Sequence, residues 1–496
     1  MQCSERLFTQ EQLERVRHWH ETAGQKGESL TEREMKLSKF VSISWRKFLK
    51  SALVSLLALA IAATPVFAYY WDADNTIFTF AYQETKNYCG PASAWMYLNF
   101  IKNKYGLSIT LPSQSALNTY GHSKNISGDP NVDPRGEAWS LYNYTPGGYY
   151  YDDWTYSTAT KGLKGAAYTV AEFQEPIVST VYGGMHFMLV RGVSADSNPY
   201  TNFPNATINA VYVADPWNPA WGYINPGYLA LGQHTYVTAS TWTSNYFTVF
   251  NYQYTVPAWT GKWVTVERDN SGTVPGGKSG GQPVPMTPNG LPDKGALNTQ
   301  NLLPPDDPKA GYAPPVVSHD YDQLDSGIAA DAEKLMPISS DQDIVAIAVQ
   351  AVDKLNFATK PGFDKAFANA VPGTPVFIHS KSSNFPNYYL VPFLQDGKTS
   401  AVVMVGIKHG QGYFMESTYT DQPLVQYPFV TEAAAKQVGR QKLGIQDFST
   451  AKVSLVWAPS KDNTQPFYPL WEVRSGTNHY YVDWNGNLRS EFTSEP

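Results

Sequence analysis

Residues 83–93 read Gln83-Glu84-Thr85-Lys86-Asn87-Tyr88-Cys89-Gly90-Pro91-Ala92-Ser93, and this stretch decides how the chain is interpreted. The residues after it are apolar nearly all round a helix and stop at Tyr105-Gly106, which predicts a helix buried in a domain core. Pro91 suits the first turn, where its missing N–H is not needed, and Gly106 suits the position after the last turn. Cys89 is therefore predicted at a helix N-terminus, where the partial positive charge favours the thiolate form.

Cys89 is one of two cysteines, and the other, Cys3, lies upstream of a predicted export signal. That signal combines a basic stretch, an apolar run over 52–68 and small residues before a predicted cleavage after Ala68. The alternative is a membrane anchor, although the run is shorter than the ~20 residues that usually span a bilayer. Either alternative places the rest of the chain outside the cytoplasm. A single remaining thiol makes no internal disulfide, so Cys89 is inert, intermolecular or chemically employed.

Composition indicates a β-rich extracellular protein of more than one domain. The chain has 496 residues, of which 16% are charged, against ~25% in ordinary soluble domains, and 14% are aromatic. The net charge of −6 gives no electrostatic basis for nucleic-acid binding, so no nucleic-acid partner is expected. Membrane contact is expected only through an uncleaved signal segment, and the sequence leaves the oligomeric state open.

Proline and glycine divide the chain, with 10 Pro and 8 Gly between Asp269 and Val317. We predict an N-terminal extension and signal peptide over 1–68 (with Met35 as an alternative start), a first domain over 69–268, a linker over 269–330 and a second domain over 331–496. One helix and several strands are expected in the first domain. The second, smaller domain is predicted to be α+β, with helices over 340–352 and 431–442, strands around 375–407 and terminal hairpins over 471–484.

A thiolate also needs a base, and His186 is the best placed histidine of the first domain. It begins an alternating strand after Gly183-Gly184-Met185, and the next strand, 208–214, ends at Asp215. Antiparallel pairing would bring the start of one strand to the end of the other, so Asp215 is expected to orient the His186 ring. Gln83, six positions before the cysteine, is expected to join the Cys89 N–H in holding a developing oxyanion.

Each of these four residues also has a simpler interpretation. Cys89 fits an inert buried thiol and His186 fits a core histidine satisfied by the sheet. Asp215 fits an Asp-Pro turn that ends a strand, and Gln83 fits an ordinary loop position. Their order along the chain favours one catalytic set over four unrelated roles. In that set Cys89 is the nucleophile, His186 the base, Asp215 the residue that orients the base and Gln83 the oxyanion donor.

The set resembles the papain-like cysteine peptidases. Its motifs Cys89-Gly90-Pro91-Ala92-Ser93, Gly184-Met185-His186 and Ala214-Asp215-Pro216 resemble the bacterial double-glycine branch, which processes bacteriocin leaders, and its secreted relatives. The resemblance covers roughly residues 79–215, extends loosely to 267 and leaves out the second domain. It implies an α+β, papain-like domain whose cysteine helix packs on an antiparallel sheet. It also implies a cysteine peptidase that acts on a peptide or protein substrate without a metal or organic cofactor.

Two other functions stay open from the sequence. The same residues would support acyl transfer to an amine, and the aromatic surface would suit an extracellular glycan or cell-wall binding protein with an inactive peptidase-like domain. Exporter-fused members of the resembled branch face the cytoplasm, whereas this chain carries a predicted export signal, so its substrate need not be a double-glycine leader. The second domain is interpreted only as a recognition, folding-assistance or inhibitory module.

Overall fold

The computed structural model describes residues 69–72, 77–146, 149–202, 205–218, 231–269, 335–445, 447–460 and 463–490. The predicted signal segment over 1–68 and nearly all of the predicted linker over 269–330 lie outside the described residues. Contacts between Cα atoms group Ala68–Pro496 as one compact unit. Among the helices described, none has both the length and the apolar character that crossing a bilayer requires.

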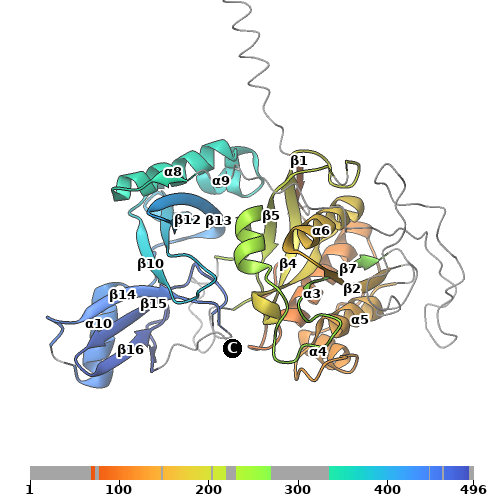
Figure 1. The fold of residues 1–496 in the computed structure, drawn as a ribbon, viewed down its shortest axis with the longest axis horizontal. Helices are drawn as coiled ribbons and strands as arrows, with labels where there is room; N and C mark the ends of the chain where they lie inside the picture. The colour runs from red at the N-terminus through yellow and green to blue at the C-terminus, as the bar shows by residue number, and fades with distance from the viewer. Residues whose placement is uncertain are drawn as a thin grey trace, which may run out of the picture. The chain divides into compact units, whose positions relative to one another are not determined.

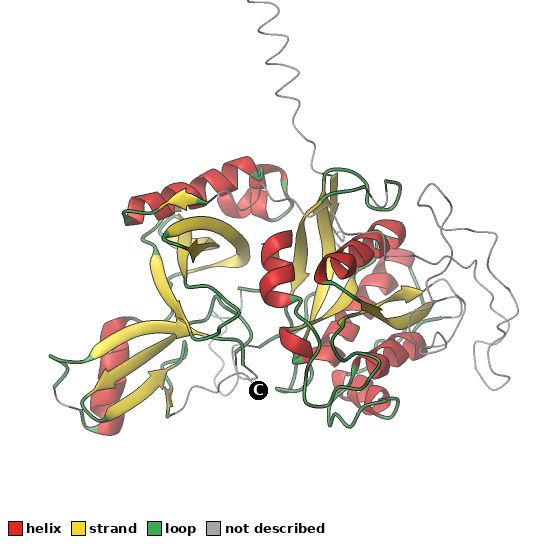
Figure 2. Cartoon of the chain, viewed as in Figure 1, coloured by secondary structure: helices red, strands yellow, loops and turns green. Residues whose placement is uncertain are grey.

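The N-terminal half combines helices with a twisted sheet (Figures 1 and 2). Its helices are α3 Cys89–Tyr105, α4 Gln114–His122, α5 Pro134–Tyr144 and α6 Ala159–Phe173, with short helical turns η1 Tyr182–Gly184, α7 Ala239–Thr241 and η3 Trp242–Tyr246. Its strands are β1 Tyr69–Asp72, β2 Tyr150–Tyr156, β3 Ile177–Val181, β4 His186–Ala195, β5 Ile208–Ala214, β6 Thr235–Thr238 and β7 Trp263–Asp269.

The sheet of this half is antiparallel, and its neighbours run β2, β7, β3, β4, β5 and β6. Alternation along β4 separates two buried cores. Phe187 and Leu189 pack with residues of α3, whereas Met188 and Val190 pack with residues of α6. The helix that carries Cys89 and helix α6 therefore cover opposite faces of the sheet, as the resemblance to papain-like domains led us to expect for α3.

The predicted helix after Cys89 is confirmed, and it ends at Gly106 in the left-handed conformation (φ 60°). The expectation of a single helix in this half was wrong, because α4, α5 and α6 follow. Helix α6 contains Gly162 and Gly165, which argue against a helix on propensity alone. Packing explains them: a Cβ at Gly162 would lie 2.4 Å from the Phe247 ring, and one at Gly165 would lie 2.6 Å from the Tyr156 ring. Tertiary contact outweighs local propensity there.

The C-terminal half is also built of helices and strands. Its helices are α8 Asp341–Lys354, α9 Phe363–Phe367 and α10 Glu432–Leu443, with the short turn η6 Phe357–Thr359. Its strands are β8 Met336–Pro337, β9 Val371–Pro372, β10 Val376–Ser380, β11 Tyr388–Gln395, β12 Lys398–Lys408, β13 Gln411–Leu424, β14 Lys452–Trp457, β15 Leu470–Ser475, β16 Asn478–Val482 and β17 Leu488–Arg489. The predicted helices and hairpins of this half are confirmed within a few residues.

One strand pair that the sequence analysis did not anticipate joins the two halves. Strand β6 of the N-terminal half pairs antiparallel with β13 of the C-terminal half, through Glu416↔Val237 and its neighbours. At the same place the Tyr246 hydroxyl donates to the buried Glu416 carboxyl, at 2.8 Å from each oxygen. Through the β6–β13 pair, the sheet that carries His186 is thus hydrogen-bonded to the C-terminal half.

Candidate active site

Cys89 is the first residue of α3 and is partly buried. The next residue has almost no room for a side chain, because a Cβ at Gly90 would lie 3.1 Å from Glu137 Oε2 and 3.5 Å from the Phe187 ring. Glu137 is fully buried, and this burial raises its pKa to about 8 although the Ala94 backbone N–H opposes the shift. Because the Glu137 carboxyl is mostly neutral at pH 7, it does not cancel the partial positive charge at the start of α3, where Cys89 lies.

His186 and Asp215 lie in direct contact, as the strand order predicted. Strands β4 and β5 pair antiparallel with Leu189 opposite Ala214, which brings the start of β4 to the end of β5. His186 Nε2 lies 2.7 Å from Asp215 Oδ1, and the two side chains are 4% and 0% exposed. The Trp217 backbone N–H also donates to Oδ1, at 2.8 Å. Asp215 therefore does more than end a strand with a turn.

The charge on Asp215 controls the protonation of His186. Burial lowers the pKa of His186, but the Asp215 charge, its hydrogen bond and the neighbouring Cys89 side chain outweigh burial and raise that pKa from 6.5 to about 10. The Cys89 side chain is thus close enough to the imidazole to contribute to the raised pKa of His186. Because Nε2 faces the carboxylate, Nδ1 is the ring nitrogen available to the sulfur. An imidazolium in this position stabilises a thiolate.

Gln83 lies in the same cleft and is 1% exposed. Its backbone N–H donates to Pro216 O at 2.8 Å, and its side-chain Nε2 donates to Thr85 O at 3.1 Å. The Thr85 carbonyl accepts only, so it orients the amide with Nε2 towards it. A primary amide has two N–H groups, and this hydrogen bond uses one of them. The Gln83 side chain is one of those that line the Cys89 cleft.

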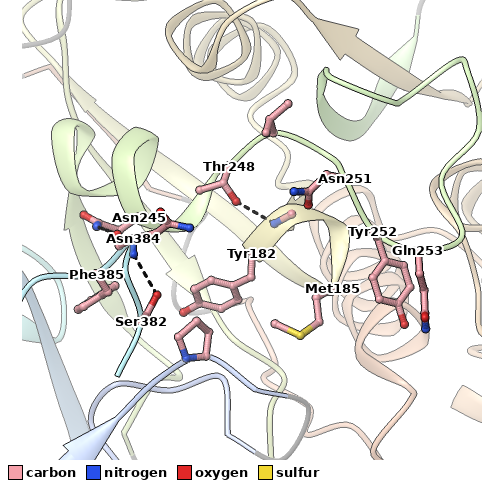
Figure 3. A pocket seen from close by; sticks show the side chains of 13 residues that line it. Tyr182, Met185, Asn245, Thr248, Asn251, Tyr252, Gln253, Ser382, Asn384 and Phe385 are labelled. Carbon is pink, nitrogen blue, oxygen red and sulfur yellow. Dashed lines mark hydrogen bonds between the residues drawn. The ribbon is translucent and has the colours of Figure 1, made fainter. Parts of the chain in front are cut away.

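The cleft and an adjoining cavity give access to these residues. The cleft has a volume of about 40 Å³, and its walls include Cys89, His186, Gln83, Trp217 and Thr464. The cavity has a volume of about 330 Å³ and shares Met185 and Tyr252 with the cleft. Figure 3 shows Tyr182 and Met185 between side chains of residues 245–253 and of residues 382–385. The lining is without any charged side chain and includes several amides, and it comes from both halves of the chain.

The sequence analysis missed Thr464 and Gln465, which reach the same carboxylate from the C-terminal half. Gln465 Nε2 donates to Asp215 Oδ2 at 2.5 Å, and Thr464 Oγ1 donates to the same oxygen at 3.2 Å. They are 250 and 249 positions from Asp215, so no local pattern signals the contact.

Comparison with known proteins finds a match within the N-terminal half of the chain. Residues 76–253 match the model of the Peptidase_C39 like family. This range contains Cys89, His186, Asp215 and Gln83 and ends before the C-terminal half, so it supports a papain-like cysteine peptidase relationship for that part of the chain. Neither the curated proteins nor the solved structures include a significant match.

Within the described part of the chain, no group of three or more His, Cys, Asp and Glu side chains is arranged to hold a metal ion. The chemistry that the site residues offer is that of a thiol, an imidazole, a carboxylate and amide groups.

Proposed function

We propose that this protein is a secreted cysteine peptidase, similar to the double-glycine branch, in which Cys89 is the nucleophile. The observation that carries the proposal is the buried His186–Asp215 pair, 2.7 Å apart, beside a cysteine at a helix N-terminus. A core histidine satisfied by the sheet alone would not need to line the same cleft as a cysteine. Secretion rests on the sequence of residues 36–68.

The proposed cycle uses only these side chains. The Cys89 thiolate attacks the carbonyl carbon of a peptide, and the oxyanion accepts hydrogen bonds from the Cys89 N–H and the second N–H of Gln83 Nε2. His186 Nδ1 gives its proton to the leaving amine, and an acyl-thioester remains on Cys89. Water attacks the thioester while His186 takes a proton from it, and the acid product leaves as the thiolate and imidazolium return. Asp215 holds the ring orientation and the imidazolium charge throughout. The cycle requires no metal or organic cofactor.

The cavity beside the cleft supports a preference within peptide substrates. Its uncharged, amide-containing lining would leave a charged substrate side chain without a counter-charge after losing water, which is costly. We therefore expect the residue that enters it to be uncharged.

The test is hydrolysis of a peptide library by the purified protein, with product identification by mass spectrometry. Cys89→Ala is the inactive variant, and Asn478→Ala, at an exposed position outside the cleft, is a control for handling. Hydrolysis by the wild type and the control, but not by Cys89→Ala, is the expected result. Equal turnover by all three would remove the assignment. Adding a primary amine separates hydrolysis from acyl transfer, since a transferase yields amide products.

A further inference from the structure

The carboxylate of Asp215 has donors on both oxygens, and they divide between the two halves of the chain. Oδ1 faces His186 Nε2 at 2.7 Å and the Trp217 N–H at 2.8 Å. Oδ2 accepts from Gln465 Nε2 at 2.5 Å and from Thr464 Oγ1 at 3.2 Å. The side chain of Asp215 is 0% exposed, so bulk water does not replace a donor that is lost.

The segment that supplies Gln465 and Thr464 is itself held in place. It belongs to the connection between β14 and β15, where the Gln465 N–H donates to Asn463 Oδ1 at 3.1 Å and Asn463 Nδ2 donates to Tyr468 O at 2.7 Å. The Tyr182 hydroxyl donates to Thr464 O at 2.8 Å and so ties this connection to the turn before His186. Gln465 is 4% exposed. Its donors are therefore fixed in position before any substrate binds.

Gly232 of the N-terminal half makes room for the Gln465 side chain. Gly232, whose carbonyl accepts from the Asp215 N–H at 3.1 Å, has a φ of +93°. A Cβ at Gly232 would lie 2.7 Å from Gln465 Cδ and 2.8 Å from its Nε2. The glycine thus meets both a backbone requirement and a close approach.

We infer that Gln465, supported by Thr464, is a positioning residue of the active site, so that the C-terminal half completes the catalytic machinery of the N-terminal half. The inference rests on the proposed function. Two donors on Oδ2 stop the carboxylate from rotating and keep Oδ1 directed at the His186 ring. They also stabilise the charged form of a buried carboxylate, which would otherwise be disfavoured.

Loss of the Gln465 donor should weaken the hold of Asp215 on the imidazolium and therefore reduce the stabilisation of the Cys89 thiolate. Hydrogen bonds to charged groups are of a strength that corresponds to about a tenfold to hundredfold effect. The other titratable groups that face Asp215 are His186 from β4, Tyr182 from the preceding turn, Glu416 from β13 and Tyr468 from the β14–β15 connection. None of these is altered in the test.

The test compares Gln465→Met with the wild type in the full chain. Methionine nearly preserves the volume that fills the space over Gly232 but cannot donate. Gln395→Met is the matched control, because Gln395 Nε2 donates to backbone carbonyls of residues 365 and 368 in the C-terminal half. The rate of Cys89 alkylation by iodoacetamide is measured from pH 4 to 10, because this readout needs no known substrate. Thermal unfolding is followed in parallel, and kcat and KM are measured on a peptide from the library.

We expect Gln465→Met to slow Cys89 alkylation at pH 7 by about tenfold relative to the wild type. We also expect it to lower kcat about tenfold or more with KM little changed, while Gln395→Met matches the wild type. A folded Gln465→Met protein with the wild-type profile and kcat overturns the inference while leaving the proposed function in place. If the wild type itself alkylates as an ordinary thiol, the proposed function fails and the inference with it. Should Gln465→Met unfold, Thr464→Val replaces it, with a smaller reduction in the alkylation rate expected and an unchanged profile counting against the inference.

Discussion

Replacing Asp215 by asparagine is the most direct test of the electrostatics proposed for the site. The substitution keeps the shape of the side chain and removes the charge that contributes most to raising the pKa of His186 against its burial. With the charge present, the pKa of His186 is raised from 6.5 to about 10, so the ring is protonated at neutral pH. With the charge removed, burial is opposed mainly by the neighbouring Cys89 side chain, so that pKa should fall. Less of the ring is then protonated at pH 7, and the thiolate loses stabilisation by the imidazolium.

The expected loss of activity is large because orientation fails together with charge. An asparagine turned to accept from His186 Nε2 directs its NH₂ group towards Gln465 Nε2, which is also a donor, 2.5 Å from the native Oδ2. The opposite rotamer directs the NH₂ group at His186 and favours the wrong tautomer. Loss of a triad carboxylate in this way costs up to about 10⁴-fold in kcat. We expect kcat/KM at pH 7 to fall by about 10³ to 10⁴.

The assay is kcat/KM together with Cys89 alkylation from pH 5 to 9. Cys89 of the wild type should be alkylated faster at neutral pH than Cys89 of Asp215→Asn, in which the imidazolium stabilises the thiolate less. Stability carries a second signature. Because the folded-state pKa of His186 is raised, its contribution to stability is complete below pH 6.5 and is lost as pH rises towards about 10. That dependence should disappear in Asp215→Asn. An unchanged alkylation profile in the variant would refute the proposed role of Asp215.

Three further predictions follow from individual side chains. Gln83→Ala should lower kcat by about 10² to 10³ with KM little changed, because an oxyanion donor is lost; an equal kcat would mean that Gln83 serves only the Thr85 turn. Glu137→Gln should reduce the pH dependence of the free energy of unfolding, measured by urea denaturation between pH 5 and 8, by about 1–3 kcal/mol. The reason is that the folded-state pKa of Glu137 is raised to about 8, so wild-type stability falls as pH rises through this window. Parallel curves for the two proteins would contradict that. Asn384→Asp adds a negative charge to the cavity and should raise the ratio of kcat/KM for a lysine-containing peptide to kcat/KM for the matching glutamate peptide by about fivefold. Asn478→Asp, outside the cavity, should leave this ratio unchanged. An equal ratio in both variants would exclude the cavity from substrate binding.

Local rules were sufficient for the parts of the site that lie close together in the chain. The end of α3 at Gly106 follows from its left-handed backbone, and the meeting of His186 with Asp215 follows from the antiparallel pairing of two consecutive strands. The helices α4, α5 and α6 had caps that the sequence analysis overlooked, since Ser113, Asp133 and Thr158 each accept a backbone N–H from the first turn. Glycines and aromatic residues interrupt the apolar periodicity in the sequences of α4, α5 and α6, so this periodicity did not predict the helices.

The contacts between the halves could not be obtained in the same way, because they depend on strand edges and buried polar groups that meet only after folding. Strand β6 offers no motif that selects β13 as its neighbour, and the sequence of residues 463–468 resembles an ordinary surface turn. Once the halves meet, the buried carboxyl groups at their contact need hydrogen-bond partners. Burial raises the pKa of Glu416 to about 8, while its hydrogen bonds from Tyr246 oppose that shift. Asp215 gains two of its donors from the same side. Removing one partner of a buried polar group destabilises the protein substantially. Substitutions along this contact should therefore affect both the stability of the C-terminal half and the geometry of the Cys89 cleft.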